Sequence, residues 1–334
     1  MNRKKLQRKE LQRKKQILFL AGIVVLLVAG TVLLLVRSAG ERRTISYHEN
    51  SQEEIVEYDG RRYRYNDHLS NYLFLGIDSR EPVETYEGRR DAGQADAIFL
   101  LSFDRAEETL QCLVIPRDTM TDIRIYAMNG ADLGTIKDHI NLQYAYGDGR
   151  HKSCELMKEA VTSMLYGIPI EGYCSLNMDG IPLLSQVIGE VEVTVPNDSL
   201  ENVAPSFYKG AKVRITEENV EQFVRYRDIK VSQSAITRTE RQKVFLKAAA
   251  VKAQQTYAED ASLVGKLYER LEPYMVTNLG NDIFARLLTA SYDPKEGVQT
   301  LPGTGEAGEV YDVYHIDDSG LFELILQMFY EQIE

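Results

Sequence analysis

An uncharged stretch of 20 residues, 17–36 (ILFLAGIVVLLVAGTVLLLV), lies close to the N-terminus of this chain. As a helix with about 1.5 Å rise per residue it is roughly 30 Å long, the thickness of the hydrocarbon core of a bilayer. A cleavable signal peptide is the alternative, but its apolar region usually has about 7–15 residues and ends at a small-residue cleavage site. Because this stretch is longer and Arg37 follows it directly, we predict an uncleaved transmembrane signal-anchor helix.

The charges on either side of this span predict its orientation. Residues 1–16 carry eight Lys or Arg and one acid, whereas three basic residues follow the span, at positions 37, 42 and 43. Because basic segments stay inside, the N-terminus is expected in the cytoplasm and the main domain outside the cell, in a single-pass protein of the cell membrane. The basic tail either contacts anionic membrane lipid or acts only as a topology signal.

The charge balance excludes some partners. The chain has a formal net charge of −11, and because its basic tail is strongly positive, the remainder is more acidic still. So acidic a body binds nucleic acid poorly, and we expect no nucleic-acid partner. The five histidines lack zinc-ligand spacing, and the odd number of cysteines, three, argues against a disulfide framework. A single bridge between Cys154 and Cys174 stays open.

Hydrophobic patterns divide the rest of the chain. Residues 37–70 are polar and read as a juxtamembrane spacer with one short strand, and 71–334 read as an extracytoplasmic domain. Continuous apolar runs at 72–77, 97–103 and 110–115 predict strands buried on both faces, the last two joined as a hairpin. Helices are expected at 154–165, 180–188, 216–227, 237–257, 282–291 and 319–333, and further strands at 191–195 and 297–301. This mixture predicts an α/β (α+β) fold with a central mixed β-sheet flanked by helices.

Charged residues follow or precede the predicted strands, and α/β folds build their sites at strand ends. Asp78 and Arg80 come directly after the first strand, and Asp96 stands immediately before the second. The alternative for Asp78 and Arg80 is a loop salt bridge of little consequence, and the alternative for Asp96 is a solvated acid at the start of a strand. Pro116 ends the third strand and presents Arg117, which Asp118 can orient; the alternative is an Arg–Asp pair that only braces a turn.

A fourth segment is rich in hydrogen-bond donors. Arg238 and Arg241 lie three apart on a predicted helix and therefore share a face, in a region that also contains Arg225, Arg227 and Gln242. In so acidic a chain the cluster indicates an anion site, the alternative being a solvated helix face. Together with Asp78 and Asp96, which can hold Mg²⁺ (or Mn²⁺) through oxygen ligands, these arginines form a constellation suited to a metal and a pyrophosphate.

Seven segments occur in one order along the chain: NYLFLGIDSR, DAIFLLSF, VIPRDT, HINLQYAYGDG, YGIPIEGY, VIGEVEVTVPND and FVRYR…RTERQ. On these segments the chain resembles the LytR-CpsA-Psr family of cell-wall glycopolymer transferases, whose layout also includes an N-terminal tail and anchor. The resemblance is strongest over about 71–242 and weaker toward the C-terminus. We therefore divide the domain into a core, 71–245, and a C-terminal extension, 246–334.

This resemblance implies a membrane-anchored, Mg-dependent phosphotransferase, with weak pyrophosphatase activity as a further possibility. It attaches a polyprenyl-pyrophosphate-linked glycopolymer, of the teichoic acid or capsule type, to peptidoglycan through a phosphodiester, with the lipid in an apolar groove. The matching catalytic residues are Asp78, Asp96 and Arg117, the two acids also holding the metal. The pyrophosphate-binding residues are Arg80, Arg117, Arg225, Arg227, Arg238, Arg241 and Gln242.

The chain departs from the family pattern at four positions. Gln94 replaces an arginine, Ala235 an aspartate, His139 a lysine and Glu190 a glycine. The loss of one pyrophosphate-facing charge can cost a few kcal/mol of transition-state stabilisation. A non-catalytic polyprenyl-phosphate-binding or regulatory envelope protein is therefore the alternative function.

Overall fold

The computed structural model describes residues 55–85, 92–127, 129–228, 230–292, 297–308 and 311–333. The predicted tail 1–16, the predicted span 17–36 and the first part of the predicted spacer, 37–54, lie outside these ranges. In the residues that the structure does describe, no helix combines the length and the apolar character that a membrane crossing requires.

The chain forms two compact units, and the described part of the smaller one comprises residues 55–65 and 331–333. Its described part contains a β-hairpin of β1 (Ile55–Tyr58) and β2 (Arg61–Tyr65), with β16 (Tyr330–Gln332) as a third strand. Asp59 and Gly60 join the hairpin with φ values of 51° and 73°, as a two-residue type I′ turn requires. The predicted spacer thus contains two strands here instead of one, and its Asp-Gly pair is the signal that indicates them.

The larger unit, Asn66–Tyr330, is built around a seven-stranded sheet. The strand order is β11-β8-β3-β4-β5-β12, with β13 also pairing with β5. Strand β4 runs antiparallel to both β3 and β5, whereas β8 runs parallel to β3. These pairings confirm a mixed sheet and the predicted hairpin. The strands are β3 (Leu69–Ile77), β4 (Ala95–Asp104), β5 (Thr109–Ile115), β8 (Gly172–Asn177), β11 (Met275–Thr277), β12 (Ser291–Tyr292) and β13 (Val298–Thr300).

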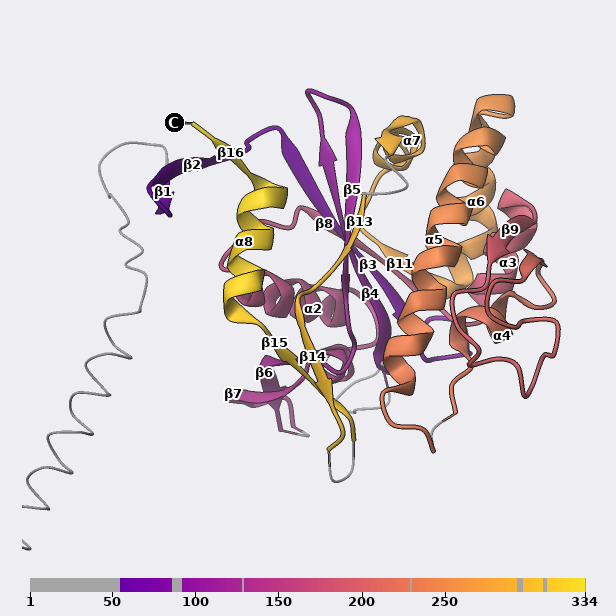
Figure 1. The fold of residues 1–334 in the computed structure, drawn as a ribbon, viewed down its shortest axis with the longest axis horizontal. Helices are drawn as coiled ribbons and strands as arrows, with labels where there is room; N and C mark the ends of the chain where they lie inside the picture. Colours follow the sequence, from indigo (N-terminus) through magenta and orange to yellow (C-terminus); the bar gives the residue numbers. More distant parts are fainter. Residues whose placement is uncertain are drawn as a thin grey trace, which may run out of the picture. The chain divides into compact units, whose positions relative to one another are not determined.

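Helices cover both faces of this sheet, which explains why its strands are apolar throughout. On β3, Leu73 is buried toward one face, while Tyr72 and Phe74 pack toward the other, where Phe74 meets Phe284 edge to face at 6.2 Å between ring centroids. Figure 1 shows α2 and α8 on one side of the sheet and α5, α6 and α7 on the other. These helices are α2 (His151–Met164), α5 (Ser234–Glu259), α6 (Leu263–Leu271), α7 (Asn281–Thr289) and α8 (Asp318–Phe329).

A second apolar cluster lies between α5 and a small two-stranded sheet. Strand β9 (Val191–Thr194) pairs antiparallel with β10 (Lys212–Ile215), and α3 (Gly180–Ile188) and α4 (Val220–Arg225) pack beside them. The side chains of Phe207, Phe223 and Phe245 lie in this cluster. The apolar lipid-binding groove expected from sequence stays a prediction.

Several predicted elements have different bounds in the structure. The helix expected at 216–227 is α4, only Val220–Arg225, and the C-terminal helix ends at Phe329 because the following residues form β16. The division at 245/246 falls inside the continuous helix α5, and later residues supply β11, β12 and β13 to the central sheet. The Cys154–Cys174 bridge does not form, because all three cysteines are free and buried.

Some elements had not been predicted. They are the hairpin of β6 (Met120–Tyr126) and β7 (Asp132–His139), the 3₁₀ helix η1 (Ile140–Tyr146) that follows it, strand β8, helix α6, and the hairpin of β14 (Gly303–Glu306) and β15 (Val313–Ile316). Strand β8 contains Cys174 and Ser175, both buried. Because it lacks a long aliphatic run, its sequence does not indicate a strand.

Candidate functional site

Three strand ends meet at one edge of the central sheet. Because β4 is antiparallel to β3 and β5, the carboxyl ends of β3 and β5 lie beside the amino end of β4. Asp78 follows β3, Asp96 is the second residue of β4, and Arg117 follows β5 after Pro116. The sequence placed these three residues at strand ends, and the sheet order brings those ends together.

Asp96 occupies a β-bulge. Gly76 on β3 pairs with Ala97 and Ile77 pairs with Ala95, so Asp96 is the extra residue that has no partner on β3. Such a bulge turns a side chain out of the ordinary alternation of a strand. At Gly76 a Cβ atom would come within 3.1 Å of the Ala97 Cβ, so the absence of a side chain allows the close approach beside the bulge.

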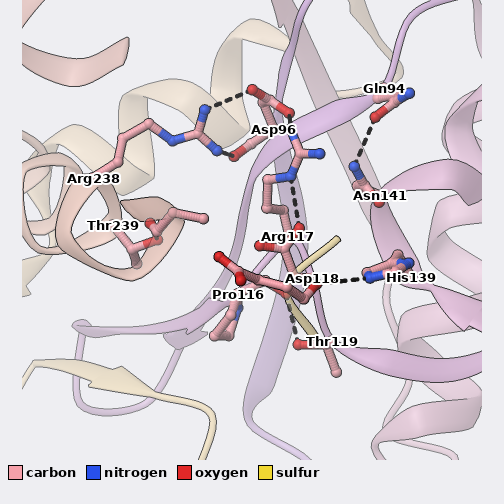
Figure 2. A network of polar contacts seen from close by, with 12 residues as sticks. Gln94, Asp96, Pro116, Arg117, Asp118, Thr119, His139, Asn141, Arg238 and Thr239 are labelled. Atoms are coloured by element: carbon pink, nitrogen blue, oxygen red, sulfur yellow. Dashed lines mark hydrogen bonds and ion pairs between the residues drawn. The ribbon is translucent and has the colours of Figure 1, made fainter. Parts of the chain in front are cut away.

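Two arginines from distant parts of the chain hold the Asp96 carboxylate, as Figure 2 shows. Arg238 on α5 donates from Nη1 to Oδ2 at 2.7 Å and from Nη2 to the Asp96 carbonyl oxygen at 3.2 Å. Arg117 donates from Nη1 to Oδ1, and its Nε donates to Asp118 Oδ1 at 3.0 Å. Arg238 is 2% exposed, and its buried Nε–H has no hydrogen-bond partner in the part of the chain that is described.

Asp78 is fixed by the segment that leads into β4. Its Oδ1 accepts a hydrogen bond from the Gln94 N–H at 2.5 Å, and its own N–H donates to the Gln94 carbonyl at 3.0 Å. Gly93, with φ of +84°, precedes this contact; a Cβ there would lie 2.8 Å from Ile77 Cγ2 and 3.1 Å from Asp78 Oδ1. Only glycine fits both the backbone conformation and the space.

The two acids differ in their electrostatics. Burial raises the pKa of Asp78, and the nearby Asp96 charge adds to this effect. Burial would also raise the pKa of Asp96, but Arg238 and Arg117 outweigh it and hold that pKa below its ordinary range. Asp96 is therefore firmly ionised, whereas Asp78 takes up a proton more readily than an exposed aspartate.

These shifts predict opposite stability effects for the two asparagine substitutions. The raised pKa of Asp78 contributes stability below the unfolded value of about 3.9, and this is lost as the pH rises through the folded pKa. Asp78→Asn should therefore stabilise the fold at pH 7 by on the order of 1 kcal/mol, and not at pH 3. The lowered pKa of Asp96 contributes stability above about 3.9, so Asp96→Asn should cost about 2 kcal/mol at pH 7.

Denaturant titrations of both variants at pH 7 and pH 3 measure these differences directly. Equal destabilisation by the two substitutions at pH 7 would contradict the assignment of the raised pKa to Asp78.

The other predicted residues lie in three different environments. Arg80 and Arg225 are exposed and share Glu221 as an ion-pair partner, with Arg80 also 3.0 Å from Asp179. Arg227 is half-buried, and its charge helps to lower the pKa of Asp96.

Arg241 and Gln242 are directed at the end of α4 and not at the Asp96 carboxylate. The Arg241 guanidinium is fully buried and donates to the carbonyl oxygens of Phe223 and Tyr226, while Gln242 Nε2 donates to the Val224 carbonyl at 3.2 Å. The shared helix face of Arg238 and Arg241 thus does not give them a shared partner. Both Nη groups of Arg241 donate to backbone carbonyl oxygens, its buried Nε–H has no hydrogen-bond partner in the described part of the chain, and its role as a pyrophosphate ligand stays a prediction.

Sequence reasoning did not single out two contributors to the site. Asn141, at the start of η1 and buried, donates from Nδ2 to Gln94 Oε1 at 2.9 Å (Figure 2) and so supports the segment that binds Asp78. Asp312, just before β15, accepts from the Gln233 N–H at 2.5 Å and from Ser232 Oγ at 2.9 Å. It thereby fixes the start of α5, one turn before Arg238; no pattern in the sequence links it to that helix.

Two of the departures from the family pattern lie close to Asp312. His139 Nε2 is 2.9 Å from the Asp312 carbonyl oxygen and therefore donates to it, and Nδ1 is 3.0 Å from Asp138 Oδ1. Ala235 lines a small pocket together with Arg117 and Asp312.

The donor set bears on whether Mg²⁺ fits here. In the ranges that the structure describes, no three His, Cys, Asp or Glu side chains are grouped so that they could hold a metal ion. The site offers two neighbouring carboxylates: Asp78 Oδ1 accepts a backbone hydrogen bond, and each oxygen of Asp96 accepts a hydrogen bond from an arginine. Mg²⁺ is commonly bound by one or two carboxylates together with substrate phosphates and water, so the pair fits an ion whose coordination the substrate completes.

The family is decided by a match along most of the chain: the LytR_cpsA_psr family model covers residues 32–328. The chain belongs to this family. Among curated LytR_cpsA_psr relatives, the polyisoprenyl-teichoic acid–peptidoglycan teichoic acid transferase TagU of Halalkalibacterium halodurans is 27% identical over 244 residues, 73% of this chain and 72% of the relative. TagU of Oceanobacillus iheyensis is 22% identical over 315 residues, 91% of this chain and 90% of the relative.

Solved structures show the same fold. The crystal structure of Bacillus subtilis TagV matches 79% of this chain and 96% of that chain with a TM-score of 0.59 and 22% identity. A structure of TagT bound to LI-WTA matches 78% of this chain and 90% of that chain, with a TM-score of 0.58 and 20% identity. The mixed α/β architecture predicted from sequence is therefore that of the family.

Proposed function

We propose that this protein is a phosphotransferase that moves a polyprenyl-pyrophosphate-linked glycopolymer of the teichoic acid or capsule type onto peptidoglycan. The observation that carries the proposal is the cluster at the sheet edge, where Asp78 and Asp96 lie beside Arg117 and Arg238. A buried arginine and a half-buried one next to two acids suit a substrate with a pyrophosphate and a hydroxyl to be deprotonated. Relatives named as polyisoprenyl-teichoic acid–peptidoglycan teichoic acid transferases support the same reaction class.

In the proposed reaction, a sugar hydroxyl of peptidoglycan attacks the phosphorus that carries the glycan. The new O–P bond forms the phosphodiester, the bond to the bridging oxygen breaks, and the polyprenyl monophosphate leaves with that electron pair. Asp78 accepts the hydroxyl proton, for which its raised pKa suits it. Arg117 and Arg238 hold the phosphate oxygens, and Asp96 keeps both guanidinium groups in place.

We further propose that Asp78 and Asp96 hold Mg²⁺ (or Mn²⁺) together with the pyrophosphate. The ion would neutralise charge on the phosphate oxygens. Arg80, Arg225 and Arg227 are proposed to contact the outer part of the same substrate, because the first two are exposed and the third acts electrostatically on Asp96.

We also propose that the catalytic domain lies outside the cell, on a membrane anchor formed by residues 17–36. The uncharged length of this segment and the basic residues before it support that arrangement. An anchor would keep the domain near a substrate whose lipid is embedded in the bilayer.

The test is a transfer assay with the full chain in lipid nanodiscs. It is incubated with a polyprenyl-pyrophosphate-linked saccharide and a peptidoglycan oligomer, with and without Mg²⁺. We expect metal-dependent formation of the glycan–peptidoglycan phosphodiester, and a loss of at least a hundredfold in rate with Asp78→Ala.

The matched control is Asp179→Ala, which removes an exposed acid paired with Arg80 and leaves Asp78 and Asp96 unchanged. Tight binding of the lipid-linked saccharide with neither transfer nor pyrophosphate cleavage, across several saccharides, would favour the non-catalytic binding or regulatory protein instead.

A further inference from the structure

A second cleft lies apart from the Asp96 cluster, between strand β9 and the flank of helix α5. Its volume is about 590 Å³, within the range of roughly 300–1,000 Å³ that is usual for ligand sites. The strand contributes Glu192 and Thr194, and the helix contributes Val244, Ala248, Val251 and Lys252. A helix beside an exposed strand edge is an arrangement that binds extended peptides by strand addition.

The edge of β9 that faces away from β10 is open. The Val195 N–H donates to the Ala211 carbonyl at 2.9 Å, and hydrogen-bonded pairs alternate along an antiparallel ladder. Val193 therefore bonds to β10, whereas the backbone N–H and C=O groups of Glu192 and Thr194 point to the other edge. Within the described residues, no group forms a hydrogen bond to these backbone atoms.

The helix side of the cleft supplies an apolar wall and a cation. Val244, Ala248 and Val251 are spaced by four and three residues, so they lie on one face of α5. Lys252 adjoins this face and has no ion-pair partner among the residues described, and Glu192 is exposed on the strand side. An extended chain in the cleft would thus meet backbone hydrogen-bonding groups, a cation for a carboxylate and an acid for an amine.

One end of the cleft leads toward the Asp96 cluster. Asn197, three residues after Thr194, donates from Nδ2 to the Thr237 carbonyl at 2.9 Å, next to Arg238. Val244, on the helix side of the cleft, is six residues from Arg238, about 9 Å along the helix axis. A polymer whose sugar lies at the cluster could therefore extend an attached peptide into the cleft.

We propose that the β9–α5 cleft binds the stem peptide of the peptidoglycan acceptor as an added strand on β9. The inference rests on the proposed function, because it takes peptidoglycan as the acceptor. Stem peptides carry free carboxylates and a free amine, and these match Lys252 and Glu192. The cleft would then select acceptor strands that still bear their peptides.

Thr194→Pro tests the strand addition with little change to the fold. Proline removes the outward-facing N–H of residue 194, which β10 does not use, and proline is tolerated on the solvent side of edge strands. Thr194→Val is the matched control, because it keeps the backbone N–H and the β-branched shape. The full chain in nanodiscs is titrated with a peptidoglycan disaccharide that carries its stem peptide and with the same disaccharide without it.

We expect Thr194→Pro to weaken binding of the peptide-bearing disaccharide at least tenfold, Thr194→Val to leave it unchanged, and the peptide-free disaccharide to bind weakly to all forms. Lys252→Glu provides a second test that leaves β9 intact and should weaken the same probe. Equal binding of the two disaccharides, unchanged binding in both Thr194→Pro and Lys252→Glu, or displacement of the probe by polyprenyl phosphate would overturn the proposal.

The binding titration separates this proposal from the proposed function. If the wild-type protein binds the peptide-bearing probe as expected but shows no transfer, the reaction is wrong and the cleft stands. If transfer to peptide-free glycan and to peptide-bearing glycan is equally fast in the wild-type protein and in Thr194→Pro, the reaction stands and the cleft assignment is wrong.

Discussion

Arg238→Met should reduce glycopolymer transfer by at least a hundredfold and destabilise the fold by about 2–3 kcal/mol. The activity falls because the substitution removes a buried donor from the proposed pyrophosphate site. The stability falls because Asp96, which is largely buried, loses one of its two cationic partners. Transfer rates and denaturant unfolding at pH 7 measure the two effects separately.

Two further variants separate charge from geometry. Arg238→Lys keeps the charge but cannot reach both Asp96 Oδ2 and the Asp96 carbonyl oxygen with one planar group, so it should recover stability more than activity. The double variant Asp96→Asn/Arg238→Met removes the unpaired charge and should be more stable than Arg238→Met alone, yet equally inactive. Transfer by Arg238→Met within a few-fold of the wild-type rate would refute the proposed role of Arg238.

Gly93→Ala is the second substitution with a large expected effect. A methyl group there would lie 2.8 Å from Ile77 Cγ2 and 3.1 Å from the Asp78 carboxylate, in a backbone conformation with φ of +84°. We expect a loss of about 2 kcal/mol of stability, because the left-handed conformation and the crowding both act against alanine. We also expect at least a tenfold loss of transfer, because the segment that binds Asp78 must shift.

Gly60→Ala is the matched control for the cost of placing alanine in a left-handed backbone conformation without crowding. Gly60 has a similar φ of +73°, but no atom lies within 4 Å of the position its Cβ would take, and it belongs to the β1–β2 turn. It should lose about 1 kcal/mol of stability and keep full activity. If both alanine variants transfer glycopolymer at the same rate, the contact between Gly93 and Asp78 has no functional consequence.

The core of the fold could be predicted because its signals are local. The segments of β3, β4 and β5 contain consecutive apolar residues, whereas a strand with one exposed face alternates apolar and polar residues. They therefore indicated a sheet covered on both faces. Polar residues at the ends of those runs then indicated the edge where Asp78, Asp96 and Arg117 now lie. By contrast, β8 lacks such a run, and the Asp-Gly turn of β1–β2 was obscured by its charged neighbours.

The candidate site shows where local reasoning fails. Arg238 and Arg241 have the same residue type and a helical spacing that suggested a common role. Arg238 reaches Asp96, on a strand 142 residues away in sequence, whereas Arg241 reaches the carbonyl oxygens that end α4. Spacing on a helix fixes which face a residue is on but not what lies opposite that face.

By itself, then, the sequence determined the apolar strands of the central sheet, the acids and the arginine at their ends, and the resemblance to the LytR_cpsA_psr family. Each of these depends on residues that are neighbours in the chain or recur in a fixed order. Only the tertiary structure decided the bulge that turns Asp96, the contact between Gly93 and Asp78, and the different partners of Arg238 and Arg241. These depend on which distant segments pack together, because burial and hydrogen bonding are satisfied across the fold and not along the chain.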